Sequence, residues 1–295
     1  FDEVSRRVEL FRVVYMRRTD PSRAWASTEL KHQHAYLTAP FFQKAREWVM
    51  ESDLAIFSGY GHPLVSRLMK MRAKALKPWC FWGERPGFRN NGFIGRMYRR
   101  WKLKTLHTSR APIWGIGQWA ISGYTREFGQ HRSYYNVPYF SDLARYRNFH
   151  KIRNQDKNAV VFLYSGSLTT RKGVDLLVEA FVRIHEQGEE CELHILGSGD
   201  LHTDLVEQTA NLSNKVYFWG FRDWSELPKV YAKADILVVP SRYDGWALVV
   251  PEGLAAGLPV ISTDKTGAAL DLIRPGINGW IVASGSADCL HAAMT

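Results

Sequence analysis

Two acidic residues in the second half of the chain have a spacing that suits the binding of a phosphorylated ligand. Asp244 and Glu252 are separated by seven residues, where an apolar stretch leads through a turn into an expected short helix. Free backbone N–H groups at a helix start bind anions, phosphate above all. The amides expected to do so are those of Gly245, Trp246, Ala247 and Leu248. With Glu252 about two turns into the helix, the pattern predicts a phosphate-bearing ligand with hydroxyl groups, such as a nucleotide sugar.

A glycine-bounded segment supplies two adjacent cations. Residues 166–173 follow an apolar stretch and open a helix, and the segment begins with Gly166 and Ser167. Glycine permits a tight turn and a close backbone approach to a ligand. Arg171 and Lys172 can neutralise a diphosphate, Arg through a planar fork and Lys as a point charge. Two surface cations are the alternative, but cations are electrostatically unfavourable at a helix start.

Composition limits the class of protein. The chain of 295 residues has no run of about 18 apolar residues, so we expect no membrane span. The three cysteines have no paired spacing, which favours a reducing cytoplasm and argues against a zinc site. No tract of ligating residues has metal-ligand spacing, and we therefore expect no metal.

Strand-length and helix-length patterns alternate along nearly the whole chain, which predicts an α/β fold of parallel sheets covered by helices. We expect two Rossmann-like domains, 1–145 and 146–295, and an interdomain connection from about 136 to 158. A short helix is expected after Ser122 as its N-cap. The expected strands are 10–15, 54–57, 79–82, 160–164, 192–196, 216–219, 236–239 and 259–262. The expected helices are 41–50, 64–75, 174–187, 201–210 and 227–232.

Ligands of open parallel sheets bind beyond the carboxyl ends of the strands. By this rule, the loops that follow the expected strands would line the binding cleft. They include Gly197, which belongs to a Gly-Ser-Gly turn, and Gly220 with Phe221 after the next strand. A lone Gly-x-Gly is more often a tight turn alone.

Charge is divided unevenly along the chain. Residues 1–150 hold 26 Lys and Arg against 11 Asp and Glu, whereas residues 151–295 hold 13 against 18. The basic half is also aromatic, as in residues 96–104. Such a surface suits an anionic membrane face or a phosphate-bearing acceptor lipid, and a solvated helix face is the alternative. Nucleic acid ranks last because no nucleic-acid-binding motif accompanies the charge.

The segment from Ser241 to Thr263 resembles the acidic–seven–acidic motif of retaining nucleotide-sugar glycosyltransferases of family 4, which have the GT-B fold. The residues before the motif and the Ala-Ala-Gly-Leu-Pro-Val run after it also match. The resemblance implies two Rossmann-like domains facing across a cleft. It further implies that the family's first strand would precede Phe1 and its closing helices would follow Thr295, so the first domain is expected to be incomplete. Asp244 stands where the family usually has Glu, and Ser167 stands where it has Arg.

The resemblance also implies roles for residues. Arg171 and Lys172 would hold the donor diphosphate, with Arg171 replacing the charge that Ser167 lacks. Asp244 would face the donor sugar or its phosphate, and Glu252 would bind the ribose hydroxyls. The loops at Gly197, Gly220 and Phe221 would contact the nucleotide. On the acceptor side Glu84 stands at the place that resembles the family site, and His62 competes for that role.

The resemblance thus implies a hexosyltransferase-type enzyme without a cofactor or metal. It would move a sugar, with retention, from a UDP or GDP donor to a glycan or lipid-linked acceptor. Cell-surface polysaccharide assembly at the cytoplasmic membrane face is the expected setting. The alternative is a non-catalytic nucleotide-sugar-binding partner of another transferase, and an epimerase or phosphorylase on the same fold is a third possibility.

Overall fold

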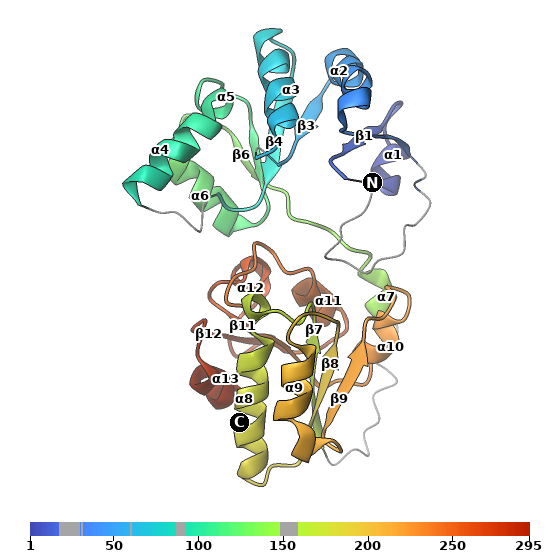
Figure 1. The fold of residues 1–295 in the computed structure, drawn as a ribbon, viewed down its shortest axis with the longest axis vertical. Helices are drawn as coiled ribbons and strands as arrows, with labels where there is room; N and C mark the ends of the chain where they lie inside the picture. The colour runs from blue at the N-terminus through green and yellow to red at the C-terminus, as the bar shows by residue number, and fades with distance from the viewer. Residues whose placement is uncertain (18–29, 31, 60, 87–91, 148–158) are drawn as a thin grey trace. The chain divides into compact units, whose positions relative to one another are not determined.

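A computed structural model describes residues 1–17, 30, 32–59, 61–86, 92–147 and 159–295. The chain forms two compact units (Figure 1). The first contains residues 1–115 and 121–135, and the second contains residues 116–120 and 136–295. The expected boundary at 145/146 thus lies within the second unit, and residues 148–158 of the expected connection lie outside the described residues.

The first unit is built on a four-stranded sheet of order β3-β4-β5-β6, in which β3 pairs with β4 and β4 with β5 in parallel. A separate parallel pair joins β1 to β2. The strands are β1 Arg12–Tyr15, β2 Gln33–Tyr36, β3 Ala55–Phe57, β4 Trp79–Gly83, β5 Ile113–Gly115 and β6 Tyr134–Asn136. The helices are α1 Asp2–Ser5, α2 Phe42–Glu51, α3 Pro63–Lys74, α4 Phe93–Lys102, α5 Lys104–His107 and α6 Gln118–Phe128, with a 3-10 turn η1 at Ala39–Phe41; residues 118–120 of α6 are grouped with the second unit.

One cation of this basic unit is structural. The Arg72 side chain on α3 is fully buried and donates to the backbone carbonyls of Pro78 at 2.8 Å and Asp53 at 2.9 Å. These bonds fasten α3 to the loops that precede β3 and β4. Burial lowers the pKa of the guanidinium, although not enough to discharge an arginine.

The structure of this unit differs from the expected one in two respects. Ser122 is not an N-cap, because α6 begins at Gln118 and Ser122 lies in its interior. Strands β2, β5 and β6 were not expected: β2 (Gln-His-Ala-Tyr) and β6 (Tyr-Tyr-Asn) contain no apolar run, and β5 is a short segment that ends in glycine.

The second unit has a six-stranded sheet of order β12-β11-β10-β7-β8-β9, and every pair of neighbours is parallel. The strands are β7 Val160–Ser165, β8 Cys191–Leu196, β9 Val216–Gly220, β10 Ile236–Val239, β11 Val260–Thr263 and β12 Gly279–Val282. The α-helices are α7 Ala144–Arg147, α8 Val174–Glu186, α9 His202–Gln208, α10 Leu227–Tyr231, α11 Val249–Ala255, α12 Gly267–Leu272 and α13 Ala287–Met294. The 3-10 turns are η3 Thr170–Lys172 and η4 Ala210–Leu212.

Helices cover both faces of this sheet, which explains its apolar strands. Successive residues of β10 point to opposite faces. Val238 belongs to the main core cluster, whose helical residues come chiefly from α8 and α13. The neighbouring Leu237 side chain lies against Gly253 of α11. Both are fully buried, so β10 carries no polar face.

The order of the strands determines where a ligand-binding site is expected. Strands β7 and β10 are neighbours at the centre, and the chain builds outward from them in opposite directions. In such sheets ligands bind at the carboxyl ends of the two central strands, where helices leave to opposite faces. The loops that follow β7 and β10 contain the predicted segments 166–173 and 243–248.

Candidate functional site

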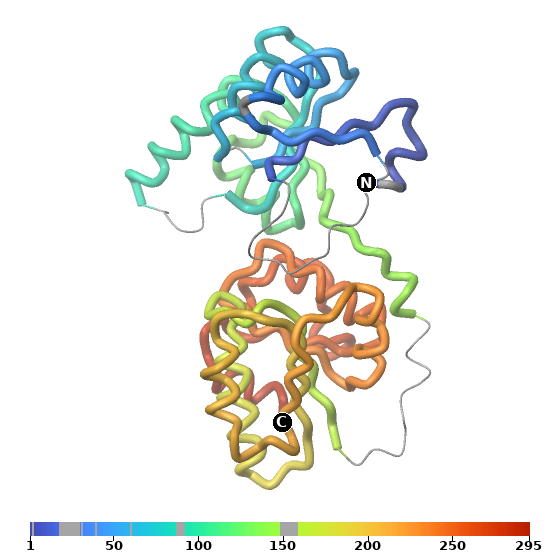
Figure 2. The backbone as a smooth tube through the Cα atoms, turned by 45° about the vertical axis from the view of Figure 1, so that its right-hand side comes forward, coloured from blue at the N-terminus to red at the C-terminus, as the bar shows by residue number. Residues whose placement is uncertain are grey.

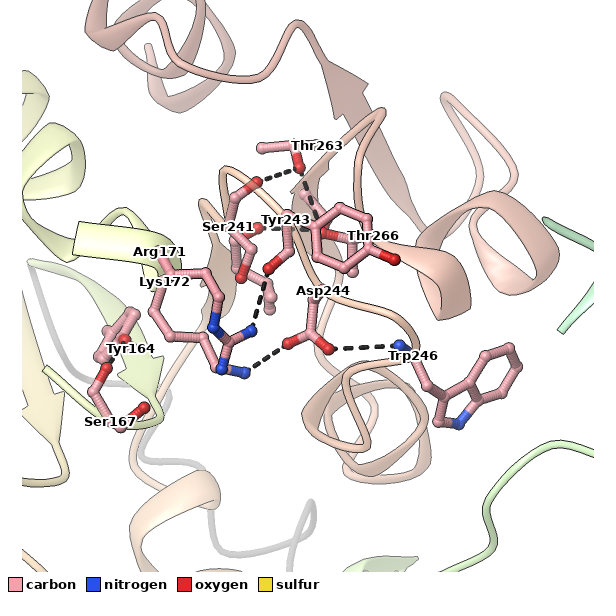
Figure 3. A network of polar contacts seen from close by, with 12 residues as sticks. Tyr164, Ser167, Arg171, Lys172, Ser241, Tyr243, Asp244, Trp246, Thr263 and Thr266 are labelled. Carbon is pink, nitrogen blue, oxygen red and sulfur yellow. Dashed lines mark hydrogen bonds and ion pairs between the residues drawn. The ribbon is translucent and has the colours of Figure 1, made fainter. Parts of the chain in front are cut away.

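The loops after β7 and β10 bring Lys172 and Asp244 together (Figure 3). The Lys172 Nζ atom forms an ion pair with Oδ2 of Asp244, and the Asp244 residue is only 8% exposed. Oδ1 accepts a hydrogen bond from the Trp246 backbone N–H at 3.2 Å. We expected the Trp246 amide to bind a ligand, but this N–H already donates its hydrogen bond to the Asp244 carboxylate.

The turn between Asp244 and α11 differs from the expected geometry. Helix α11 begins at Val249, so Glu252 lies in its first turn rather than two turns into it. Ala247 has φ +68°, a left-handed conformation that costs a non-glycine residue energy. This residue redirects the chain between the buried Trp246 and the start of α11.

Arg171 and Arg242 join the two loops. Arg171 is exposed and donates from Nη1 to the Tyr243 carbonyl at 3.0 Å. Arg242 makes a two-pronged ion pair with Asp175 of α8, with both N–O distances 2.7 Å. This pair raises the pKa of Arg242. Arg242 was not among the expected site residues, because its partner lies 67 residues away and no local pattern marks the pair.

Glu252 occupies a mostly buried position lined by hydroxyl groups. Burial raises the pKa of its carboxyl, and the nearby hydroxyl groups and a guanidinium partly oppose this shift. The opposing groups are Ser141, Arg145, Tyr146 and Tyr231. Tyr146 lies on α7, in a stretch that the sequence analysis assigned to an interdomain connection. Tyr146 and Glu252 are far apart in the chain, so no local pattern marks their proximity.

The glycine turns connect the carboxyl ends of three neighbouring strands through the backbone. Gly166 donates to the Leu196 carbonyl at 2.9 Å, and Gly197 donates to the Gly220 carbonyl at 2.9 Å. Gly197 has φ +135°, and a Cβ there would lie 1.8 Å from the Gly166 oxygen. The Ser167 carbonyl accepts from the buried Tyr164 hydroxyl at 2.7 Å. The structure thus brings together the predicted loops of the second unit, and Phe221 beside them is 37% exposed.

Both acceptor-side candidates belong to the first unit. Glu84 follows β4 and is exposed, and its backbone carbonyl accepts from the Tyr124 hydroxyl at 2.7 Å. His62 precedes α3, and its buried Nδ1 has no hydrogen-bond partner within the described residues. Their roles stay predictions.

Within the described ranges, no three His, Cys, Asp or Glu side chains are grouped so that they could hold a metal ion. None of the described helices has the length and apolar character needed to cross a bilayer.

Residues 146–295 match the family model of glycosyl transferases group 1. An uncharacterized glycosyltransferase of Methanocaldococcus jannaschii is 34% identical over 137 residues, which cover 45% of this chain and 35% of that protein. A GDP-mannose-dependent monoacylated alpha-(1-6)-phosphatidylinositol monomannoside mannosyltransferase of Corynebacterium glutamicum is 26% identical over 209 residues, or 65% of this chain and 54% of that protein. The chain therefore spans about a third to a half of these relatives.

The fold has solved counterparts. The crystal structure of HepE from Anabaena in complex with UDP matches with a TM-score of 0.72 and 19% identity, and it covers 88% of this chain and 75% of that one. The predicted fold class, α/β with parallel sheets as in GT-B glycosyltransferases, is confirmed.

Proposed function

Because the chain belongs to the family of glycosyl transferases group 1, we propose that it binds a nucleotide-diphosphate sugar in its second unit and transfers the sugar to an acceptor. The observation that carries the proposal is the Lys172–Asp244 pair at the carboxyl ends of the two central strands. At that position the cation can bind the diphosphate of the donor and the carboxylate can face its sugar.

The diphosphate is assigned to the cations of the loop after β7. A bound diphosphate would compete with Asp244 for the Lys172 ammonium, and the exposed Arg171 lies next to it in sequence. Positive charge placed there stabilises the departing diphosphate, where negative charge develops as the glycosidic bond breaks. Asp244, freed from Lys172, would then face the sugar as it gains oxocarbenium character.

The ribose is assigned to Glu252, because an ionised carboxylate accepts hydrogen bonds from a vicinal diol. For the transfer we propose retention by front-face attack, in which the leaving phosphate takes the acceptor proton. This mechanism requires no protein nucleophile, and Glu84 is the proposed acceptor-side residue. Neither a metal nor a cofactor is part of the proposal.

The relatives guide the choice of donor and acceptor. HepE was solved with UDP, and the Corynebacterium protein is named for GDP-mannose and a phosphatidylinositol mannoside. We therefore propose a UDP or GDP donor and a glycan or lipid-linked acceptor in polysaccharide or glycolipid assembly. The proposed location is the cytoplasmic face of the membrane.

The proposal is tested by nucleotide binding followed by turnover. Calorimetry and thermal melts of the purified chain with UDP, GDP and ADP, each with magnesium or EDTA, identify the base and any metal requirement. We expect one nucleotide to raise the melting temperature equally with magnesium and with EDTA, and Lys172→Ala to reduce that shift. No shift with any nucleotide would contradict the donor site.

Turnover separates the enzyme from a second candidate. Asp244 is one methylene shorter than the glutamate usual in the resembled motif, and it is paired with Lys172. These two features favour a nucleotide-sugar-binding partner without activity as the alternative. Release of nucleotide from the cognate sugar donor, with or without added acceptor, supports the enzyme. Tight donor binding with no release or transfer supports the binding partner.

A further inference from the structure

Helix α4 turns an apolar face to solvent. Four of its five large apolar side chains come one, four, five and eight residues after the first, Phe93. At 100° per residue, all five lie within an arc of about 140° around the helix. They are Phe93 at 69% exposed, Ile94 at 82%, Met97 at 59%, Tyr98 at 51% and Trp101 at 71%. No residue of α4 is buried by the described part of the chain. Figure 2 shows this helix, in teal, extending from the rest of its unit.

The opposite face of α4 is the one that attaches to the unit. The Arg99 Nε atom pairs with Glu127 of α6 at 3.3 Å, and both side chains are at most 14% exposed. The other oxygen of Glu127 contacts His107 of α5 at 3.2 Å. A surface helix ordinarily packs its apolar side on the core and leaves its charges in water. In α4 an arginine anchors the inner side, and the apolar side faces outward.

A basic groove adjoins this helix. A cavity of about 970 Å³ runs between α3 and the segment from Trp101 to Ala111. Its cationic lining residues are Arg67, Lys70, Lys74, Lys77, Lys102, Lys104 and Arg110, and no acidic residue is among its described lining. Trp101 belongs both to the groove and to the apolar face, so the two features form one continuous surface.

Charge complementarity indicates the partner. Residues 54–115 contain 13 Lys and Arg, and Glu84 is the single acidic residue among them. Five exposed apolar side chains require an apolar phase, which a soluble phosphate does not offer. The groove cations have no acidic partner among the described residues, and a dense anionic surface would complement them. A bilayer containing anionic phospholipid supplies both, and Trp and Tyr favour its interface.

We propose that this surface, the apolar face of α4 with the basic groove, binds the chain peripherally to anionic phospholipid membranes. The apolar side chains of α4 enter the boundary between headgroups and acyl chains, and the groove cations contact lipid phosphates. This inference rests on the membrane location proposed above, for which it names the surface and the lipid class, and it does not depend on the donor site.

The test is co-sedimentation of the full chain with vesicles of phosphatidylcholine alone or with about one third phosphatidylglycerol. Wild type is expected to bind the anionic vesicles and to be released by salt. Ile94→Ser plus Trp101→Ser is expected to reduce the partition coefficient about tenfold or more, because it removes two membrane-facing side chains. Lys70→Glu plus Lys74→Glu is expected to cause a comparable loss, since each lysine near such a surface contributes several-fold.

Matched controls distinguish binding through this surface from nonspecific adsorption of the protein to vesicles. Ile277→Ser plus Trp280→Ser removes two similar side chains, 79% and 48% exposed, from the second unit. Lys229→Glu plus Lys265→Glu reverses two exposed charges there. We expect both controls to partition like wild type, and all variants to keep the wild-type circular dichroism and nucleotide binding. Retained nucleotide binding separates failure of this inference from failure of the proposed donor site.

Several outcomes would overturn the proposal. Binding that is equal on neutral and anionic vesicles, or that survives both α4 and groove variants, would exclude this surface as the lipid contact. Wild-type self-association that is abolished by Ile94→Ser plus Trp101→Ser would identify a second copy as the occupant. Tighter binding of single-stranded RNA than of anionic vesicles would identify nucleic acid instead.

Discussion

At the scale of single residues, the site depends on how Asp244 is held. Its carboxylate is mostly buried, yet it has both an ammonium and a backbone N–H as partners. A buried carboxylate without partners would be strongly destabilising. The same pair therefore keeps the loop folded and places a cation where a diphosphate is proposed to bind.

Replacement of Lys172 should affect ligand binding and stability together. We expect Lys172→Ala to weaken nucleotide binding about tenfold to a hundredfold, the usual range for a lost charge-assisted hydrogen bond. It should also lower the free energy of unfolding by about 1–3 kcal/mol, because Asp244 loses its partner. Calorimetric titration and urea unfolding measure the two effects.

Lys229→Ala is the control, because this exposed lysine lies on α10 of the same unit. It should change neither quantity. An unchanged nucleotide affinity in Lys172→Ala would remove the lysine from the proposed donor site.

Glu252 should give stability and affinity opposite dependences on pH. Burial raises the pKa of its carboxyl in the folded chain. The folded state therefore favours the protonated form, and the free energy of unfolding should fall as pH rises through that raised pKa. Ribose binding uses the ionised form, so nucleotide affinity should rise over the same pH interval.

Glu252→Gln should remove this part of both pH profiles and weaken nucleotide binding at neutral pH. Glu207→Gln, at an exposed position on α9, is the control and should retain both profiles. Melting temperature and Kd measured from pH 4 to pH 8 check the prediction. Parallel rather than opposite slopes in wild type would contradict it.

At the scale of elements, the site depends on close backbone contact between the turn after β7 and the end of β10. Gly173 is buried with φ +71°, and a Cβ there would lie 2.1 Å from the Pro240 carbonyl oxygen. Gly188 follows α8 with φ +85° and has nothing within 4 Å of the corresponding position. The two glycines share the left-handed backbone and differ in the space around them.

Alanine at these two positions should therefore separate backbone strain from steric conflict. We expect Gly188→Ala to cost about 1 kcal/mol, which is typical of a residue forced to positive φ. Gly173→Ala should cost more than about 3 kcal/mol and also weaken nucleotide binding, since the loop carrying Lys172 must move. Urea unfolding of both variants gives the difference, and equal costs would show that the turn can relax away from β10.

At the scale of the whole molecule, the proposed donor site belongs to one unit. The loops after β7, β8 and β10 and the start of α11 all lie within the second unit. The basic surface of α3, α4 and α5 lies within the first. Donor binding and membrane binding are thus assigned to separate bodies of the chain.

Hydrogen exchange should reveal this division. We expect the cognate nucleotide to slow exchange most in the loops 166–173, 197–199 and 240–252, because bound ligand stabilises the segments that contact it. Amides of β3 and β4 should change least. Mass spectrometry of the exchanged full chain measures this, and stronger protection of β3 and β4 than of those loops would place the nucleotide elsewhere.

Most of the strands and helices of the second unit, and the loops that carry the candidate site, could be predicted from the sequence alone. Apolar strands and amphipathic helices alternate regularly, and parallel strands carry their ligand loops on one edge, so the loops 166–173 and 243–248 could be placed on a cleft wall without coordinates. The Asp244 and Glu252 spacing identified the motif because seven residues are a local distance. The position of α4 was marked only as a basic aromatic stretch, since a sequence does not say which side of a helix faces the core.

Tertiary structure decided what depends on distant partners. Only the fold shows that Lys172 pairs with Asp244, that Arg242 binds Asp175, and that Glu252 is buried among hydroxyl groups of α7 and α10. It also determined that Arg72 is buried as a structural cation and that the apolar side of α4 faces solvent. Local patterns predict elements because they arise from backbone periodicity, whereas burial, pairing and pKa arise from packing between residues that are far apart in the chain.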